Sequence, residues 1–515
     1  MKRTRIDYII KNLTTGLFAQ VLSLGLAFFS RKVLIVTLGN EYLSLNGLFS
    51  SILTVLSLAE LGFGGAIIYS LYKPLATSDN EKIKSLMYLY KRAYRLIALI
   101  VFAIGIIFMP FIKMIINREP DIPENIYFIF FLFLINSVSS YFFAYRRSII
   151  SASQANYLIS RVNIASSILL TGTQIIILLV FQNFILYFLM NIIINILSNI
   201  YISRLAEKLY PIIKEKNIAP LPEETKQDIK VNVKSLILYK TGSLLGTGLD
   251  NMIISYFVSF ASVGIYSNYL LITKGVNSLL STVFQSATAS IGNLNALSDT
   301  GTRERIYRSF LFIAFWLYGF TNIAFFNLLN PFIKLVFGEF YLFGEEIVLT
   351  ISLSGFLFGL HQPTMAYRNT MGLYRYGRLR PVLGAILNVI LSLLLVNPLG
   401  VLGVLLGTLG SRIFLLSWFE PRINYKFGLK MPPAKFFSDY VRYAIVFMLT
   451  AFIAKWAVMQ VQSESIMAFL LKILITIVVP NVVFLLLFRK SEHFIYLINA
   501  GKDVLKRKFR QGEGQ

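Results

Sequence analysis

The sequence predicts an all-α polytopic membrane protein with about 14 transmembrane helices. Of the 515 residues, 56% are apolar and only 14% are charged, and Leu/Ile/Phe-rich runs occur along the whole chain. A helix that spans a bilayer needs about 20 mainly apolar residues, so about 14 such helices with short loops account for the full length. Little sequence remains for a soluble domain, and a soluble globular protein of this composition is not expected.

Hydropathy places each expected helix in order. The basic and then apolar start of the chain has no small-x-small cleavage site, so the first span is expected to be retained. The candidate spans lie near residues 12–38, 45–71, 92–117, 124–148, 158–181, 184–205, 235–258, 264–292, 309–332, 346–371, 381–397, 399–419, 441–459 and 465–488.

The distribution of basic residues predicts the orientation. With spans alternating in direction, only four of the 49 Lys and Arg residues fall in loops opposite the N-terminus, namely Lys113, Arg118, Lys334 and Lys455. Basic loops stay on the cytoplasmic side, so both termini are expected in the cytoplasm. The net charge of +24 follows from this topology, and no nucleic-acid recognition motif accompanies it.

A polar break divides the chain. Residues 206–234 are charged and contain three prolines, and they separate six predicted spans from eight. We therefore expect an N-terminal bundle over 1–210, a cytoplasmic linker over 211–233, a C-terminal bundle over 234–430, and two further helices with a basic tail over 431–515.

The two sets of spans show a faint internal similarity. LSLNGLFSSI (43–52) aligns with VGIYSNYLLI (263–272) at an offset of 220 residues. Because the first set has an even number of spans, both sets start from the same side of the membrane, as in transporters with parallel repeats.

Several activities are excluded by what the sequence lacks. There is no cysteine for a disulfide or thiolate site, two histidines are too few for a His-rich metal site, and no Walker A motif is present. The predicted outer loops are also too short to hold a glycosyltransferase or polymerase site. The sequence thus predicts no enzyme and no cofactor other than a coupling Na⁺ or H⁺.

Three ionisable residues are predicted to share one layer inside the membrane. At ~1.5 Å per residue, Asp250, Lys274 and Arg31 lie ~10–15 Å below the outer ends of their spans. A structural Asp250–Lys274 ion pair is one interpretation, and an interfacial position for Asp250 is another. The third is an ion-coupling or gating role, with Asn251 supplying a further oxygen, because a buried charge needs a partner, water or a function.

A second layer is predicted nearer the cytoplasm. Glu60, Lys240 and Arg412 lie ~9–17 Å above the cytoplasmic ends of their spans. Glu60 is a weaker coupling candidate next to a glycine cluster, whereas Lys240 and Arg412 either extend toward the headgroups or line a cavity. The excess of basic residues predicts that Arg31, Lys240, Lys274 and Arg412 bind an anionic substrate such as a phosphate or an acidic sugar.

One predicted span contains both a histidine and a proline. Pro363 is expected to interrupt the helix over 346–371, and His361 nearby is expected to bond internally and not to act as a ligand.

Two stretches resemble a known family. LSLAELGFGGAIIYSLYKPLATSDNEKIKSLMYLYKRAYR (56–95) and LDNMIISYFVSFASVGIYSNYLL (249–271) resemble the polysaccharide-transport branch of the multidrug/oligosaccharidyl-lipid/polysaccharide exporter superfamily, which includes the Wzx-type flippases. The resemblance implies two six-helix bundles around a central cavity plus two C-terminal helices. It further implies transfer of undecaprenyl-pyrophosphate-linked repeat units for capsule or related polysaccharide to the outer leaflet, driven by a cation gradient.

The resemblance also implies that the protein lies in a bacterial plasma membrane, and it implies partners. These are the lipid-linked oligosaccharide, membrane lipids, and the polymerase and glycosyltransferases of polysaccharide biosynthesis. A drug exporter of the same superfamily, a membrane glycosyltransferase or polymerase, and a non-transporting scaffold remain alternatives.

Overall fold

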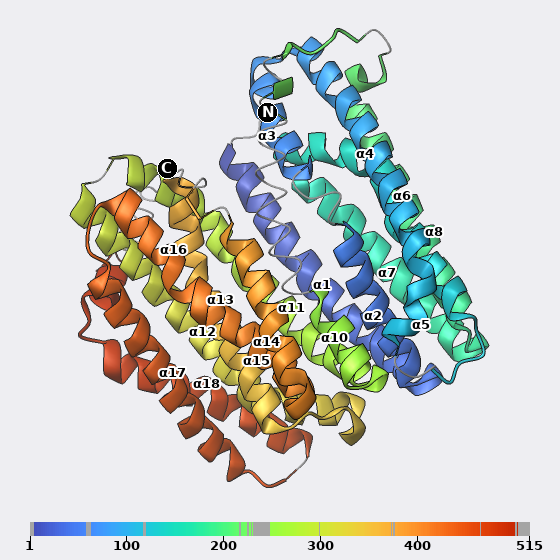
Figure 1. The fold of residues 1–515 in the computed structure, drawn as a ribbon. Helices are drawn as coiled ribbons and strands as arrows, with labels where there is room; N and C mark the ends of the chain where they lie inside the picture. Colours follow the sequence, from blue (N-terminus) through green and yellow to red (C-terminus); the bar gives the residue numbers. More distant parts are fainter. Residues whose placement is uncertain are drawn as a thin grey trace, which may run out of the picture. The chain divides into compact units, whose positions relative to one another are not determined.

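The structure, a computed structural model, describes residues 5–57, 63–116, 120–215, 248–297, 299–371, 379–463 and 465–499 together with isolated positions between them. These residues are almost entirely helical and contain no strand, which confirms the predicted all-α membrane fold. The principal helices are α1 (Arg5–Leu38), α2 (Asn40–Leu56), α3 (Phe63–Thr77), α4 (Asn80–Phe108), α5 (Ile112–Ile115), α6 (Ile126–Ala152), α7 (Asn156–Phe181), α8 (Phe184–Leu209), α10 (Asp250–Phe257), α11 (Phe260–Leu297), α12 (Thr300–Phe337), α13 (Glu345–Thr370), α14 (Arg380–Leu399), α15 (Val401–Ser411), α16 (Ser417–Ile423), α17 (Ala434–Met459) and α18 (Ile466–Phe488) (Figure 1). Short 3₁₀ segments occur at Met109–Phe111, Pro211–Lys214 and Glu339–Tyr341, and π-helical turns at Arg412–Leu416 and Asn424–Leu429.

Eleven helical segments among the described residues are long and apolar enough to cross a membrane. Each of them covers most of one predicted span. The predicted span 45–71 is instead formed by α2 and α3, which end at residue 56 and begin at residue 63. Of the predicted span 235–258, only the part from residue 248 is described. Part of the predicted linker 211–233 also lies outside the described residues, and the predicted domain boundaries stay predictions.

The chain divides into two compact units. The first comprises Met1–Leu271 and Arg378–Val404, and the second comprises Ile272–Gly377 and Leu405–Gln515. Helix α11 passes from the first unit into the second. The first unit therefore combines α1–α8 with α10, the start of α11, α14 and the first residues of α15.

In the first unit, α1 lies along α7, and polar pairs hold the two helices in register. The Ser23 and Ser167 hydroxyls are 3.3 Å apart, and seven residues further on Ser30 Oγ donates to Gln174 Oε1 at 3.3 Å. Both pairs are separated by 144 residues, so the two helices run in parallel. A seven-residue interval returns to the same helix face, as in coiled-coil packing.

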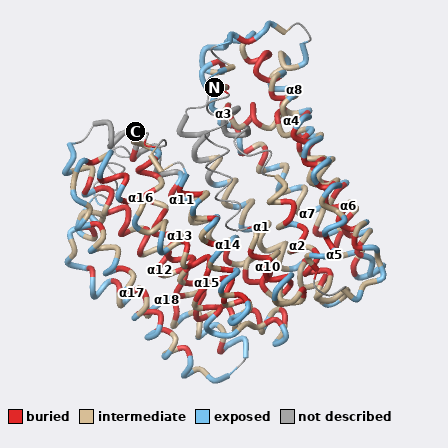
Figure 2. The backbone as a smooth tube through the Cα atoms, viewed as in Figure 1, coloured by how far each residue is buried: buried red, intermediate tan, exposed pale blue. Residues whose placement is uncertain are grey.

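In the second unit, α12 is the central helix. It packs against α13, α17 and α18, and most of its membrane-spanning part is buried (Figure 2). Aromatic rings fill the contact: Phe315 stacks on Tyr443 of α17 with centroids 4.5 Å apart and meets Phe484 of α18 at 4.6 Å. The last two spans therefore cover α12, and α18 keeps an apolar, largely exposed outer face that suits contact with lipid.

The prediction that Pro363 interrupts its helix was wrong. Helix α13 continues from Glu345 to Thr370 with Pro363 inside it. Membrane helices tolerate an internal proline because neighbouring helices and polar side chains satisfy the freed backbone groups.

Candidate substrate and gating site

Helices from the two halves of the sequence meet at one end of the first unit. Helix α10 packs against α2 (Figure 1). Hydrogen bonds join α1 and α2 to α10 and the first part of α11. We call this contact the junction, defined by Arg31, Asn40, Ser44, Gly47 and Ser51 on one side and Asn251, Gly264, Ser267 and Asn268 on the other. It lies where α1 ends at Leu38 and α2 begins at Asn40, a turn that Gly39 makes with φ of 88°.

Arg31 connects α1 to α11. Its Nη1 donates to the backbone oxygen of Ser267 at 2.7 Å, and it lies 3.2 Å from both Ser267 Oγ and Asn268 Oδ1. Among the described residues, every hydrogen-bond acceptor of this guanidinium is a neutral oxygen. Arg31 is therefore held by dipoles and keeps its positive charge within a predicted membrane span.

Asp250 and Asn251 begin α10, and both are buried at 5% exposure. Asn251 Nδ2 donates to Ser51 Oγ at 2.8 Å and to the Gly47 oxygen at 3.3 Å, so Asn251 links α10 to α2. Asp250 is held on the same short helix, which also packs against α14. The carboxylate that the sequence singled out is thus inside the protein.

Small residues bring α2 and α11 close together. A Cβ atom placed on Gly47 would lie 3.3 Å from Val263 Cγ1 and 3.4 Å from the Ser267 Cβ. A Cβ on Gly264 would lie 2.5 Å from Ser44 Oγ, closer than side chains approach one another. Small residues allow this close approach in membrane helices.

The junction leaves several buried polar atoms without a hydrogen bond. They are Asn40 Oδ1, Asn251 Oδ1 and Asn268 Nδ2. A buried polar atom without a partner costs about 1–3 kcal/mol. If the helices separate, water can hydrogen-bond to these amides and recover part of that cost. Opening the junction is therefore less unfavourable than opening a contact whose polar atoms are all paired.

The other predicted site residues are placed as follows. Arg412 belongs to the second unit, where its Nη1 donates to the Ser354 oxygen at 2.5 Å and to Ser354 Oγ at 2.7 Å. Lys274 is exposed and is assigned to the second unit, whereas Asp250 is buried in the first. The predicted Asp250–Lys274 pair stays a prediction. Lys240 and Glu60 lie outside the described residues.

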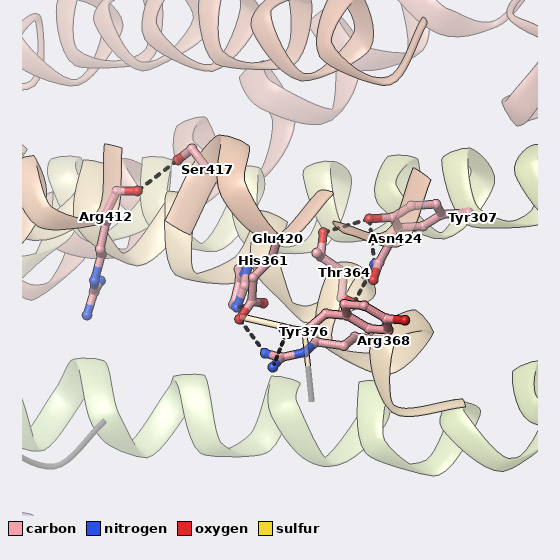
Figure 3. Close-up of polar contacts among 9 residues, drawn as sticks. All are labelled: Tyr307, His361, Thr364, Arg368, Tyr376, Arg412, Ser417, Glu420 and Asn424. Carbon is pink, nitrogen blue, oxygen red and sulfur yellow. Dashed lines mark hydrogen bonds and ion pairs between the residues drawn. The ribbon is translucent and has the colours of Figure 1, made fainter. Parts of the chain in front are cut away.

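The second unit contains a buried ionic cluster that the sequence did not predict. Glu420 is fully buried and accepts a hydrogen bond from Arg368 Nη1 at 2.7 Å, while His361 Nε2 lies 3.0 Å from its other oxygen (Figure 3). Arg368 Nη2 also donates to the Tyr376 oxygen at 3.0 Å. Arg412 lies apart from this cluster (Figure 3).

A neutral network of Tyr307, Thr364 and Asn424 adjoins the cluster. Asn424 Nδ2 donates to the Thr364 oxygen at 2.9 Å and lies 3.3 Å from the Tyr307 hydroxyl, which donates to Thr364 Oγ1 at 3.0 Å. Glu420 and Asn424 are presented by α16 and the π-helical turn that follows it. Such turns often occur at functional sites because they re-aim side chains.

Sequence reasoning missed Glu420 because the predicted span ended at 419. The helical segment continues from Val401 to Leu429, which places Glu420 inside it. The signal was present in the stretch SWFEPRI, where a carboxylate precedes Pro421 at the end of an apolar run. The expectation that His361 bonds internally agrees with its position beside Glu420.

Comparison with protein-family models and with curated proteins gave no match. Among solved structures, the lipid II flippase MurJ in an inward closed conformation is similar, with a TM-score of 0.66 and 16% identity over 94% of this chain and 99% of that chain. A mutant of the Vibrio cholerae MATE transporter VcmN has a TM-score of 0.58 and 13% identity over 81% of this chain and 98% of that chain. A multidrug resistance MATE family transporter of the MOP superfamily in an inward-facing conformation has a TM-score of 0.55 and 16% identity over 80% and 95%. The chain therefore has the polytopic membrane fold that MurJ shares with MATE transporters of the MOP superfamily.

Proposed function

We propose that the protein is a flippase that moves an undecaprenyl-pyrophosphate-linked polysaccharide repeat unit from the inner to the outer leaflet by alternating access. The observation that carries the proposal is the environment of Arg31, a cation inside a membrane span held only by neutral oxygens among the described residues. A diphosphate headgroup is a better acceptor than these oxygens because charge-assisted hydrogen bonds are about twice as strong as neutral ones. The fold shared with a lipid flippase supports the proposal.

The same contacts suggest how substrate opens the junction. Arg31 donates to Ser267 and Asn268 of α11 while the junction is closed. A diphosphate that reaches Arg31 competes for the same guanidinium and removes bonds that join α1 to α11. Because the substrate then interacts better with the open state than with the closed one, it shifts the population toward opening.

We propose that Asp250 couples this step to a Na⁺ or H⁺ gradient. Asp250 is buried at the start of α10, and its neighbour Asn251 makes the bonds to α2. Helix α10 also packs against α14, whose Asn388 and Ser392 are buried polar residues. A proton or cation that neutralises a buried carboxylate changes the stability of the short helix that closes the junction.

The test is a lipid-flip assay with the full-length protein in proteoliposomes. A fluorescent polyprenyl-diphosphate oligosaccharide is incorporated, and its appearance in the opposite leaflet is followed with a membrane-impermeant quencher. We expect Arg31→Gln to slow transfer ~10- to 100-fold, the equivalent of one charged hydrogen bond of about 1.5–3 kcal/mol. Arg161→Gln removes an exposed arginine of α7 and should leave the rate within ~2-fold, a change of less than about 0.5 kcal/mol in barrier.

Three outcomes would contradict the proposal. Transfer of cationic dyes without transfer of the lipid would indicate a drug exporter, and formation of a glycosidic bond would indicate an enzyme. Equal transfer in empty vesicles and in vesicles containing the protein would favour a scaffold.

A further inference from the structure

The first unit contains a polar cavity at the end opposite the junction. Its volume is about 310 Å³, and helices α3, α4, α6 and α8 line it. The polar groups of the lining belong to Tyr94, Tyr141, Arg147, Asn195, Asn199 and three serines of α6. A hydrogen bond marks this end of the unit. Asn12, near the start of α1, donates from Nδ2 to the Gln154 oxygen just after α6. Arg147 is ~10 Å along α6 from that contact, whereas Arg31 is ~28 Å along α1 from it.

The polar groups of the lining determine which kind of ligand fits the cavity. Its described residues supply three serine and two tyrosine hydroxyls, two amides and one cation, and none of them is a carboxylate. Small-molecule sites typically have volumes of ~300–1,000 Å³, so this cavity has room for one small group. Hydroxyl and amide groups match the donors and acceptors of a sugar, and the cation excludes a positively charged ligand.

One N–H group of the Arg147 guanidinium makes no hydrogen bond with the described residues. Its Nη2 donates to Asn163 Oδ1 of α7 at 2.9 Å, which holds the side chain in place. Its Nε is buried and has no hydrogen-bond partner. A buried N–H without a partner is unfavourable, so an acceptor bound in this cavity would gain that bond.

The amides are already oriented. Asn195 Nδ2 donates to Asn136 Oδ1 at 2.9 Å, and Asn199 Nδ2 donates to Asn195 Oδ1 at 2.9 Å. This chain of bonds fixes both lining amides and leaves each with unused hydrogen-bonding groups. A ligand would not need to order these side chains, which lowers the entropic cost of binding.

We propose that this cavity binds a singly charged, hydroxylated carboxylate, namely a hexuronic acid residue. The inference deepens the proposed function and rests on it, because such a residue would be part of the transported saccharide. One guanidinium with no acid opposite it among the described lining residues matches a monoanion. A diphosphate carries more charge than a single cation compensates, and a neutral sugar leaves the guanidinium without an anion.

The test uses the full-length protein in lipid nanodiscs and three probes, sodium glucuronate, glucose and inorganic phosphate. Binding is measured by isothermal titration calorimetry and by saturation-transfer NMR. We expect glucuronate to bind at least tenfold more tightly than glucose or phosphate. Arg147→Gln should weaken glucuronate binding at least tenfold and leave glucose binding unchanged.

Two further variants test the proposal even if Arg147→Gln folds poorly. Arg161→Gln removes the same charge from an exposed position and should bind glucuronate like the wild type. Asn195→Leu removes a lining amide without changing charge and should weaken both glucuronate and glucose. Equal glucuronate binding by the wild type and Arg147→Gln would overturn the inference. So would phosphate binding at least as tightly as glucuronate, or no saturable binding at ~10 mM glucuronate, about ten times the dissociation constant of a weak ~1 mM site.

The cavity assignment and the proposed function are contradicted by different results. If the lipid-flip assay shows transfer but glucuronate does not bind, the cavity assignment is wrong and the flippase proposal stands. If glucuronate binds through Arg147 but no lipid-linked saccharide is transferred, the cavity binds a sugar acid and the flippase proposal is wrong.

Discussion

Gly264 of α11 lies against Ser44 of α2, so close that a Cβ on the glycine would be 2.5 Å from the serine Oγ. These two residues are separated by 220 positions, the offset that aligns the two internally similar stretches of the sequence. Gly47 and Ser267 are separated by the same 220 positions, and a Cβ on Gly47 would lie 3.4 Å from the Ser267 Cβ. Equivalent positions of the two halves therefore contact each other, as expected when related helices pack across an approximate two-fold axis.

The Gly47–Ser267 contact predicts a disulfide that locks the junction. The Cβ positions are 3.4 Å apart, near the roughly 3.5–4.5 Å typical of disulfides, and the chain has no native cysteine to interfere. Gly47→Cys combined with Ser267→Cys should cross-link on mild oxidation and stop lipid transfer, and reductant should restore it. The measurement is electrophoretic mobility after protease cleavage between α2 and α11, together with the flip assay. Full transport in the cross-linked protein would show that the junction does not need to open.

The Gly264–Ser44 contact predicts that a single methyl group loosens the junction. Gly264→Ala should push α2 away from α11 and slow formation of the Gly47→Cys/Ser267→Cys cross-link at least several-fold. Gly172→Ala is the matched control because a Cβ at Gly172 meets nothing within 4 Å. The cross-linking rate of both variants is compared with that of the parent pair, and equal rates for all three would argue against close packing of α2 and α11.

Asp250 provides a prediction about coupling. Asp250→Asn keeps the shape of the side chain and removes its charge, so transfer should continue at a reduced rate and lose its dependence on an imposed Na⁺ or H⁺ gradient. Asn251→Leu should preserve that dependence, because it removes only the bonds to Ser51 and Gly47. The readout is the ratio of transfer rates with and without each gradient, and an unchanged ratio in Asp250→Asn would exclude Asp250 as the coupling group.

The buried cluster of Glu420, Arg368 and His361 predicts a large effect on stability. Glu420→Ala leaves the Arg368 charge buried without its carboxylate, which typically costs about 3–5 kcal/mol. Thermal unfolding of the detergent-solubilised protein should show a clear decrease in the unfolding temperature. Glu346→Gln, an exposed carboxylate on α13, should have no effect.

A double substitution separates the charge effect from packing. Glu420→Leu with Arg368→Leu removes both charges and should recover much of the lost stability, because apolar replacements of buried ion pairs are often neutral. If the double variant is no more stable than Glu420→Ala, the cluster stabilises the unit through its shape and not through charge pairing.

The sequence by itself determined the class of fold and the approximate position of most spans, and it singled out Asp250 and Arg31 as candidate site residues. This was possible because insertion into a bilayer depends on the hydropathy of about 20 consecutive residues, which is a local property. The tertiary structure alone decided that Arg31 bonds to α11, that Glu420 lies inside a helical segment, and that a cavity forms around Arg147. Helix pairing in a membrane depends on small residues and on the geometry of polar groups far apart in the sequence, and hydropathy carries no information about either.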